Sequence, residues 1–410
     1  MRQKILVFLV LALLLAGTAS AQHRVTMASP SEGDLVGSGD LVAPLGLKAA
    51  QISTDPVALS WPLESAQALK AQATPFVAQS KEYFVDIDAA DLAQGVVFTT
   101  QAPGALLRIN PAPGAAKATA AVDPMGLVLT TADKRAFTAG TGFDQMASAD
   151  QLKAAGAPFV EGTTAFRLGS EVGAGTLHLQ AEGLPAEGRY VLHVFDRGSD
   201  VALELQADRV SYLHGQTLTV TARLAGDVTA RQVDGFVTSP AGRAWPLTFE
   251  ATEAGFEARL ALDALEAPAP GLWQVHASAQ GGDMASPVLR HARTAFDVAV
   301  PSARLTGEVA FERGEQGWGL ALGVEAAAAG RYEVRGVLYG TGRDGQVRPA
   351  AVAHSADHLA SGNGTLRLSF DLSELRASGL RAPFQVRDLR LMDQGTLGLL
   401  HQQALGLVIE

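Results

Sequence analysis

The chain has 410 residues, and its 32 Lys and Arg against 42 Asp and Glu give a net charge of −10. Hydrophobic residues make up 47% and charged residues 18%, which is the composition of a globular protein and excludes a largely disordered one. There is no Cys, which excludes disulfides, thiolate metal sites, iron–sulfur clusters and cysteine nucleophiles, and the acidic balance argues against nucleic-acid partners.

The first residues have the pattern of a secretory signal peptide. Arg2 and Lys4 form a basic region, residues 5–16 are apolar, and residues 19–21 (Ala-Ser-Ala) match the small-residue cleavage pattern. An uncleaved anchor is the less favoured alternative, because a membrane helix needs about 20 apolar residues. We therefore predict cleavage after Ala21, no transmembrane segment in the mature chain, and an exported protein that is periplasmic or extracellular.

The next segments are predicted from composition. Residues 22–44 are rich in Gly, Ser and Asp without a period, which predicts a flexible leader. Only Glu64–Lys70 and Ala147–Ala155 have the composition of helices. Elsewhere between residues 45 and 200, short segments alternate apolar and polar residues as half-buried strands do. These segments are 83–87, 96–100, 106–109, 176–180 and 190–195.

Two further regions contain strand signals at regular spacing. Breaks at residues 198–200 and at Pro301 delimit residues 201–300 and 303–410. Each region holds seven alternating segments, the expectation for an immunoglobulin-like sandwich. They are 201–206, 217–224, 232–238, 245–250, 256–262, 271–279 and 293–298, then 304–311, 318–325, 331–339, 347–354, 365–372, 384–393 and 398–409. The sequence thus predicts an all-β protein of three tandem β-sandwich domains, of which the second and third are immunoglobulin-like and the first is larger, with short helices.

Turn residues mark two connections of the last region. Asp344-Gly345 and Asn363-Gly364 are dipeptides that tolerate the positive φ of two-residue hairpin loops. We predict a hairpin turn at each.

Nine histidines are present, and one pair has the spacing of metal ligands. His354 and His358, with Asp357 between them, would share one face if the segment were a helix. The alternative is that the segment is a strand end followed by a polar loop, which would leave no metal site.

Three carboxylates lie close together in the first region. Asp86, Asp88 and Asp91 offer hard oxygen ligands of the kind that Ca²⁺ prefers, so calcium is the one cofactor considered. The mid-loop Gly and distal Glu of an EF-hand are missing. The alternative is that Asp86 and Asp88 face solvent and Asp91 belongs to a turn.

The sequence contains none of the common catalytic or phosphate-binding motifs that we considered. The G-x-S-x-G elbow, the H-E-x-x-H helix and the phosphate-binding GxxxxGK[ST] loop are all missing, so no catalytic residue is predicted. Trp245, Trp273 and Trp318 lie in strand patterns, where buried indoles anchor a core.

Several segments resemble a known family. GVLYGTG at residues 336–342, RPAAVAHS at 348–355, FDLSEL at 370–375 and RDLRLMDQ at 387–394 resemble the last domain of an exported bacterial family, of gammaproteobacterial type, with tandem immunoglobulin-like domains and no known function. YFVDIDAADLAQGV at 83–96 and GRYVLHVFD at 188–196 are similar to its N-terminal domain. The resemblance implies an envelope or secreted sandwich protein and brings no catalytic residue.

Two functions follow as hypotheses. The first is a non-catalytic exported protein that binds or scaffolds a protein or glycan partner in the cell envelope or outside the cell. The alternative is a secreted hydrolase, or an accessory subunit of one, with a carboxylate or His/Asp metal site.

Overall fold

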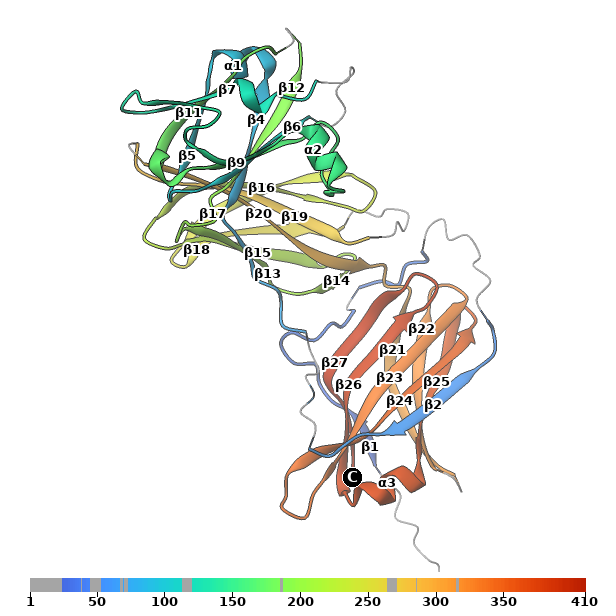
Figure 1. Ribbon diagram of the computed structural model, residues 1–410. Helices are drawn as coiled ribbons and strands as arrows, with labels where there is room; N and C mark the ends of the chain where they lie inside the picture. Colours follow the sequence, from blue (N-terminus) through green and yellow to red (C-terminus); the bar gives the residue numbers. More distant parts are fainter. Residues whose placement is uncertain are drawn as a thin grey trace, which may run out of the picture.

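The computed structural model describes residues 24–37, 39–44, 53–66, 69, 73–112, 120–184, 187–263, 271–284, 286–314 and 317–410. Nearly all of its regular structure is antiparallel β-sheet in sandwiches, which confirms the predicted fold class. Buried hydrophobic side chains form three large separate cores. The three groups of strands around them follow one another along the molecule (Figure 1), and we call them the first, middle and last modules. Among these residues no helix is long and apolar enough to cross a membrane.

The first module packs a four-stranded sheet, in the order β5-β11-β7-β8, against strands β4, β12, β6, β10 and β9. Its predicted helix is confirmed as α2 (Ala149–Ala154), which begins at Ser148, whose side chain accepts a hydrogen bond from the Gln151 backbone. The strands are β4 (Glu82–Asp88), β5 (Val96–Thr100), β6 (Leu106–Pro111), β7 (Leu127–Thr131), β8 (Ala136–Thr138), β9 (Phe143–Ala147), β10 (Thr164–Leu168), β11 (Gly175–Ala181) and β12 (Arg189–Phe195), with α1 (Ala89–Gln94) after β4.

The middle module contains the seven strands expected from the alternation of apolar and polar residues. In β19, Trp273, Val275 and Ala277 are buried, while Gln274 and His276 point to the opposite face. Trp273 is buried, as predicted, and stacks at 5.0 Å on Trp245, which is half-buried at the edge of this core. Trp318 of the last module is also half-buried. The strands are β13 (Ala202–Ala207), β14 (Ser211–Leu213), β15 (Thr217–Ala225), β16 (Ala230–Thr238), β17 (Ala244–Thr252), β18 (Gly255–Ala261), β19 (Trp273–Gly282) and β20 (Pro287–Ala299), and β3 (Ala78–Ser80) pairs with β13.

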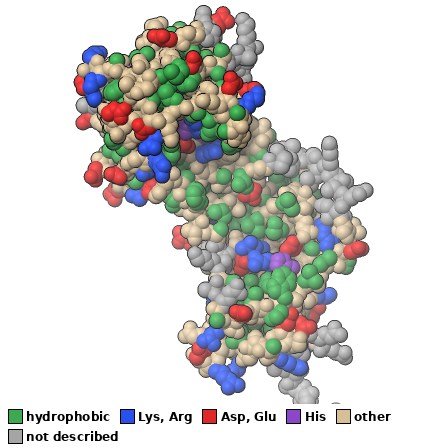
Figure 2. All heavy atoms as spheres, viewed as in Figure 1, with side chains coloured by type: hydrophobic (Ala, Val, Ile, Leu, Met, Phe, Trp, Pro, Cys, Tyr) green, Lys and Arg blue, Asp and Glu red, His purple; other side chains and the backbone are tan. Residues whose placement is uncertain are grey.

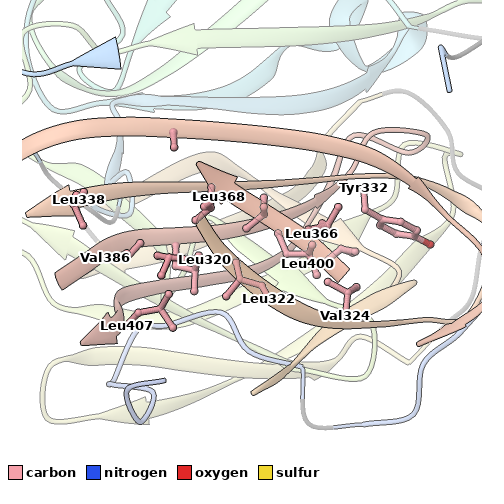
Figure 3. Close-up of a cluster of buried hydrophobic side chains, with 14 of the residues drawn as sticks. Leu320, Leu322, Val324, Tyr332, Leu338, Leu366, Leu368, Val386, Leu400 and Leu407 are labelled. Carbon is pink, nitrogen blue, oxygen red and sulfur yellow. The ribbon is translucent and has the colours of Figure 1, made fainter. Parts of the chain in front are cut away.

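The last module packs a six-stranded sheet, in the order β1-β27-β26-β23-β24-β2, against a three-stranded sheet, β21-β22-β25. Leu320 and Leu322 of β22 and Leu368 of β25 meet Val386 and Leu407 of the larger sheet (Figure 3). The elements are β21 (Ala303–Arg313), β22 (Gly317–Ala326), β23 (Gly330–Thr341), β24 (Val347–Leu359), β25 (Gly362–Asp371), α3 (Leu372–Ser378), β26 (Arg381–Asp393) and β27 (Gly398–Ile409).

Both edge strands of the larger sheet come from the beginning of the chain. Strand β1 (Val25–Met27) pairs with β27, and β2 (Val57–Pro62) pairs with β24. Part of residues 22–44, which were predicted as a flexible leader, is therefore ordered against the last module. We call the described residues between 24 and 63 the N-terminal arm.

Two local predictions differ from the structure. Of Glu64–Lys70, the described positions 64–66 and 69 are not helical, and the other positions lie outside the described residues. Asn363-Gly364 lies within β25, where Asn363 pairs with Glu325, so no hairpin turn forms there. Asp344-Gly345 does lie in a turn, between β23 and β24, and Gly345 has a φ of 78°. The predicted signal peptide, residues 1–21, lies outside the described residues.

Candidate binding trough

The sheets of the first and middle modules join at a single residue pair. His291 of β20 pairs with Glu82 of β4, and this one pair makes the strand order continuous from β16 through β19, β20, β4, β12 and β6 to β10. Paired residues on neighbouring strands point to the same face. The registers therefore define one row of side chains that crosses the junction: Asp234, Ser278, His291, Glu82, Phe195, Leu106 and Arg167.

Shorter rows run beside it on the same face. Phe236, His276 and Arg293 are paired across the middle module, and Phe84, His193 and Arg108 are paired across the first module. We call the face formed by these rows the trough.

The trough is hollow. Cavities of about 850 Å³ and about 800 Å³ lie along it and share Glu82, Arg108 and Phe195 in their walls. In Figure 2, basic and histidine side chains lie in a hollow where the first module meets the middle module. Cavities of this size hold small-molecule ligands in other proteins.

A polar chain lies in the floor of the trough, on β4, β12 and β6. The Arg108 Nε donates to Nδ1 of His193 at 2.9 Å, and Nε2 of His193 lies 2.7 Å from a carboxylate oxygen of Glu82. Because a guanidinium can only donate, Nδ1 must be an acceptor, so His193 is the neutral tautomer that donates from Nε2 to Glu82. That hydrogen bond lowers the pKa of the Glu82 carboxyl, although burial acts in the opposite direction.

Phenylalanine rings cover the histidines of the trough. Phe84 stacks on His193 with ring centroids 4.6 Å apart, and Phe236 stacks on His276 at 4.7 Å. Phe84 and Phe236 are 41% and 44% exposed, and Phe76 at the rim is 70% exposed. One face of Phe84 and one face of Phe236 are therefore covered by a histidine, and the rest of each ring is accessible to a ligand. All three phenyl groups line the same cavity.

Burial lowers the pKa of two other histidines of the trough. Burial lowers the pKa of the His291 imidazole, against the attraction of Glu82, and its Nδ1 lies 3.4 Å from the backbone N of Phe84 as an acceptor. Burial, and then the positive charge of Arg293, lower the pKa of His276.

A buried ion pair fixes the junction behind the trough. Arg290 and Asp196 are 1% and 0% exposed at the side chain, and Nη2 of Arg290 lies 2.9 Å from the Asp196 carboxylate. Arg290 also donates to Val201 O and Ser199 Oγ, and Asp196 accepts from the backbone of Gln101. Since both charges have several partners, this pair holds the connection after β12 against β20.

The structure does not bring the predicted histidine ligands together. His354, Asp357 and His358 all lie in strand β24, not in a helix. Four residues span about 13 Å along a strand, so the two imidazoles point to the same face too far apart to share one ion. His354 instead bonds Glu333 through Nδ1 at 2.8 Å and stacks on Trp61.

The three aspartates are separated in the same way. Asp86 and Asp88 are exposed on β4, and Asp88 faces Arg189 at 3.7 Å, while Asp91 lies in the first turn of α1. Within the described ranges, no three His, Asp or Glu side chains are placed to hold a metal ion.

The sequence alone did not identify the trough. Its residues come from seven strands of two modules, and only the pairing registers show that they share a face. The signal that was present is the alternation within each strand, which put Phe84, His193 and His276 opposite the core positions.

Comparisons with known proteins identify relatives of both ends of the chain. The profile of the N-terminal domain of DUF4785, a domain of unknown function, matches residues 48–196, and that of the DUF4785 C-terminal domain matches residues 302–409. No curated protein matches.

Solved structures show the same likeness in the fold. The crystal structure of a DUF4785 family protein from Legionella pneumophila aligns with a TM-score of 0.73 at 22% identity, over 90% of this chain and 98% of that one. Escherichia coli alpha-2-macroglobulin activated by porcine elastase aligns over 82% of this chain and 30% of that one at 12% identity, with a TM-score of 0.16.

Proposed function

This chain belongs to the DUF4785 family, and from that premise we propose that it is an exported, non-catalytic protein that binds a ligand in the trough. The observation that carries the proposal is the sheet that continues from the middle module into the first, with accessible phenyl rings along its hollow face. Large concave surfaces of mixed apolar and polar character are the usual places where proteins hold ligands.

The polar chain in the floor supports binding over catalysis. A general base needs a nitrogen or oxygen that is free to take a proton from the substrate. Both ring nitrogens of His193 are occupied, one by Arg108 and one by Glu82, and the ring is 3% exposed. Arg108, His193 and Glu82 therefore act together as a rigid floor that supports the ring of Phe84.

The ligand that fits this surface is apolar or aromatic where it touches the floor. Phe84 and Phe236 lie on β4 and β16, three strand spacings or about 14 Å apart across the sheet. The registers also place Phe236 level with Ser80, so Phe84 is four residues or about 13 Å further along the strands, and the two positions are about 19 Å apart. A partner with two apolar groups at that separation would cover both rings, and an extended peptide supplies them at residues i and i+6.

Binding is tested with a hydrophobic dye and a peptide library. The protein from residue 22 onward is titrated with anilinonaphthalene sulfonate, and a displayed 12-residue peptide library is selected on it. We expect saturable dye fluorescence that is lost in the double variant Phe84→Ser and Phe236→Ser, and enrichment of peptides with apolar residues six apart.

The control is Leu397→Ser, because Leu397 is 77% exposed and lies in the last module. Dye or peptide binding that survives the double Phe variant, or that is lost equally in the control, contradicts the proposal.

Export is supported by the signal-like pattern of residues 1–21. Expression with the native N-terminus in a gammaproteobacterial host, followed by fractionation, tests it. We expect the protein in the periplasm or the medium with Gln22 as its first residue by mass spectrometry. An intact N-terminus in the cytoplasmic fraction contradicts it.

A further inference from the structure

A second surface lies on the outer face of the six-stranded sheet of the last module. The registers place Leu59 of β2, His354 of β24, Arg335 of β23 and Arg390 of β26 in one row across this face. Arg387 follows on the next row of β26, with its guanidinium 4.7 Å from the centre of the Tyr339 ring. We call these side chains, with Trp61 and Asp388, the arginine face.

One carboxylate holds two of the arginines in place. Asp388 accepts from Nη1 of Arg335 and from Nε of Arg390, both at 2.8 Å, and is only 6% exposed. Its backbone has a φ of 48°, a left-handed conformation that is unfavourable for a residue with a side chain. It lies where the register of β26 shifts against β23, between Arg387 and Arg390, and the register against β27 shifts nearby, between Val386 and Arg387. Such bulges re-aim side chains, and strained residues of this kind concentrate at functional sites.

The two guanidinium groups keep donors for a further partner. Each guanidinium has five N–H donors, and the bonds to Asp388 use one nitrogen of each. Among the described residues, the other nitrogens of Arg335 and Arg390 have no hydrogen-bond partner. Both side chains are about one-third exposed, at 30% and 31%. Arg335, Arg387 and Arg390 outnumber the carboxylates Asp388 and Glu333 on this face, so this part of an acidic chain is locally positive.

An aromatic platform stands beside the arginines. Trp61 stacks on His354 with ring centroids 5.2 Å apart and an interplanar angle of 9°, and Trp61 is 44% exposed. Glu333 fixes the imidazole through Nδ1, and Gln394 in turn donates to Glu333. Trp61 is on β2, two strands from Arg335 on β23 and three strands from Arg390 on β26, so their backbones lie about 10–14 Å apart. His354 lies between Trp61 and Arg335 in this strand order.

We propose that the arginine face binds an acidic saccharide. A sugar ring lies on Trp61, and a carboxylate or phosphate group of the same saccharide accepts hydrogen bonds from Arg335 and Arg390, the geometry in which arginine recognises oxyanions. A neutral sugar would leave the guanidinium donors unused, and a simple anion would leave the Trp61 ring uncovered. This site is independent of the trough.

The test uses calorimetry with three defined probes on the protein from residue 22 onward. Tri-galacturonate carries carboxylates, mannose 6-phosphate carries a phosphate, and maltotriose is neutral. We expect binding of one of the acidic probes, which identifies the oxyanion, together with quenching of Trp fluorescence, and at least tenfold weaker binding of maltotriose.

The variants separate the charge from the fold. Arg335→Lys with Arg390→Lys keeps the partners of Asp388 charged but removes the fork geometry, and Trp61→Ala removes the platform. Each is expected to weaken the acidic probe at least tenfold. The matched control is Arg367→Gln on the opposite sheet, where Arg367 pairs with Glu312 in solvent. Binding of none of the probes, equal affinity for maltotriose, full displacement by polyglutamate, or an equal loss in the control overturns the proposal.

Discussion

The two junctions between modules are built in different ways. Between the first and middle modules a sheet continues through the His291–Glu82 pair, and the buried Arg290–Asp196 pair lies behind it. Between the middle and last modules, the N-terminal arm is inserted: Leu35 is buried beside Leu213 and Ala299, and Val42 N donates to Pro301 O at 3.0 Å.

The difference shows where rigidity comes from in each case. The first junction is made by residues of the two modules that it joins, and it keeps the walls of the trough in register. The second junction depends on a segment that is more than 150 residues away in sequence from the strands that it bridges. Changes to the arm should therefore affect the last module and leave the trough intact, and changes to the buried pair should do the reverse.

Removal of the N-terminal arm is expected to have the largest effect. Deleting residues 22–63 takes away both edge strands of the last module and the buried Leu35. We expect the calorimetric transition of the last module to fall by about 10 °C or more. A separate peptide of residues 24–63 should restore part of the loss. An unchanged transition would show that the arm does not stabilise this module.

Breaking the buried pair is expected to be next in size. Arg290→Met leaves the Asp196 carboxylate buried without its cation, which costs about 3–5 kcal/mol of unfolding free energy. Urea denaturation measures the change. Arg367→Gln, at a solvent-exposed pair, should cost no more than about 1 kcal/mol. Similar losses for the two variants would mean that Arg290 has no special role at the junction.

A cavity at the other junction should be somewhat milder. Leu35→Ala removes a buried side chain between the middle and last modules and is expected to cost about 2–4 kcal/mol. Hydrogen exchange locates the effect, because the backbone N–H of Leu35 and that of Gln402 each donate to the carbonyl of the other residue and so join the arm to β27. Faster exchange around β12 and β4 would contradict the separation of the two junctions.

Acidification should produce the smallest and broadest effect. Burial lowers the pKa of His291 in the trough and of His401 in the last module below the ordinary value of 6.5. At pH values between these lowered pKa values and 6.5, the unfolded chain binds more protons than the folded one. The free energy of unfolding therefore falls as the pH drops below about 6.5. His291→Gln should flatten this dependence for the first junction and His401→Gln for the last module. Equal pH profiles in wild type and variants exclude these two groups.

Most strands could be predicted from the sequence because alternation is a local property. All seven predicted segments of the last module and all seven of the middle module overlap observed strands. In the first module β7 to β10 were missed, because they are short and lie close to turns. Helices α1 and α3 were also missed, although Asp371 before α3 and Gly379 after it are residue types that favour helix ends.

The trough and the arm could not be predicted in this way. Both depend on pairings between residues far apart in sequence, such as Glu82 with His291 and Val25 with Ile409. Alternation states which side chains share a strand face, but it contains no information about which strand lies alongside. For the same reason His354 and His358 were considered at helical spacing, although β24 places them on a strand.

The pairing of Val25 with Ile409 also determines when folding can finish. The chain is made from its N-terminus, so β1 exists long before residues 398–409, which form its partner strand. The strands of the first and middle sandwiches are complete before β27 is made, but the last sheet acquires its final edge only with residues 398–409. A chain stalled or clipped near its C-terminus would leave the arm without a partner and β26 with an open edge.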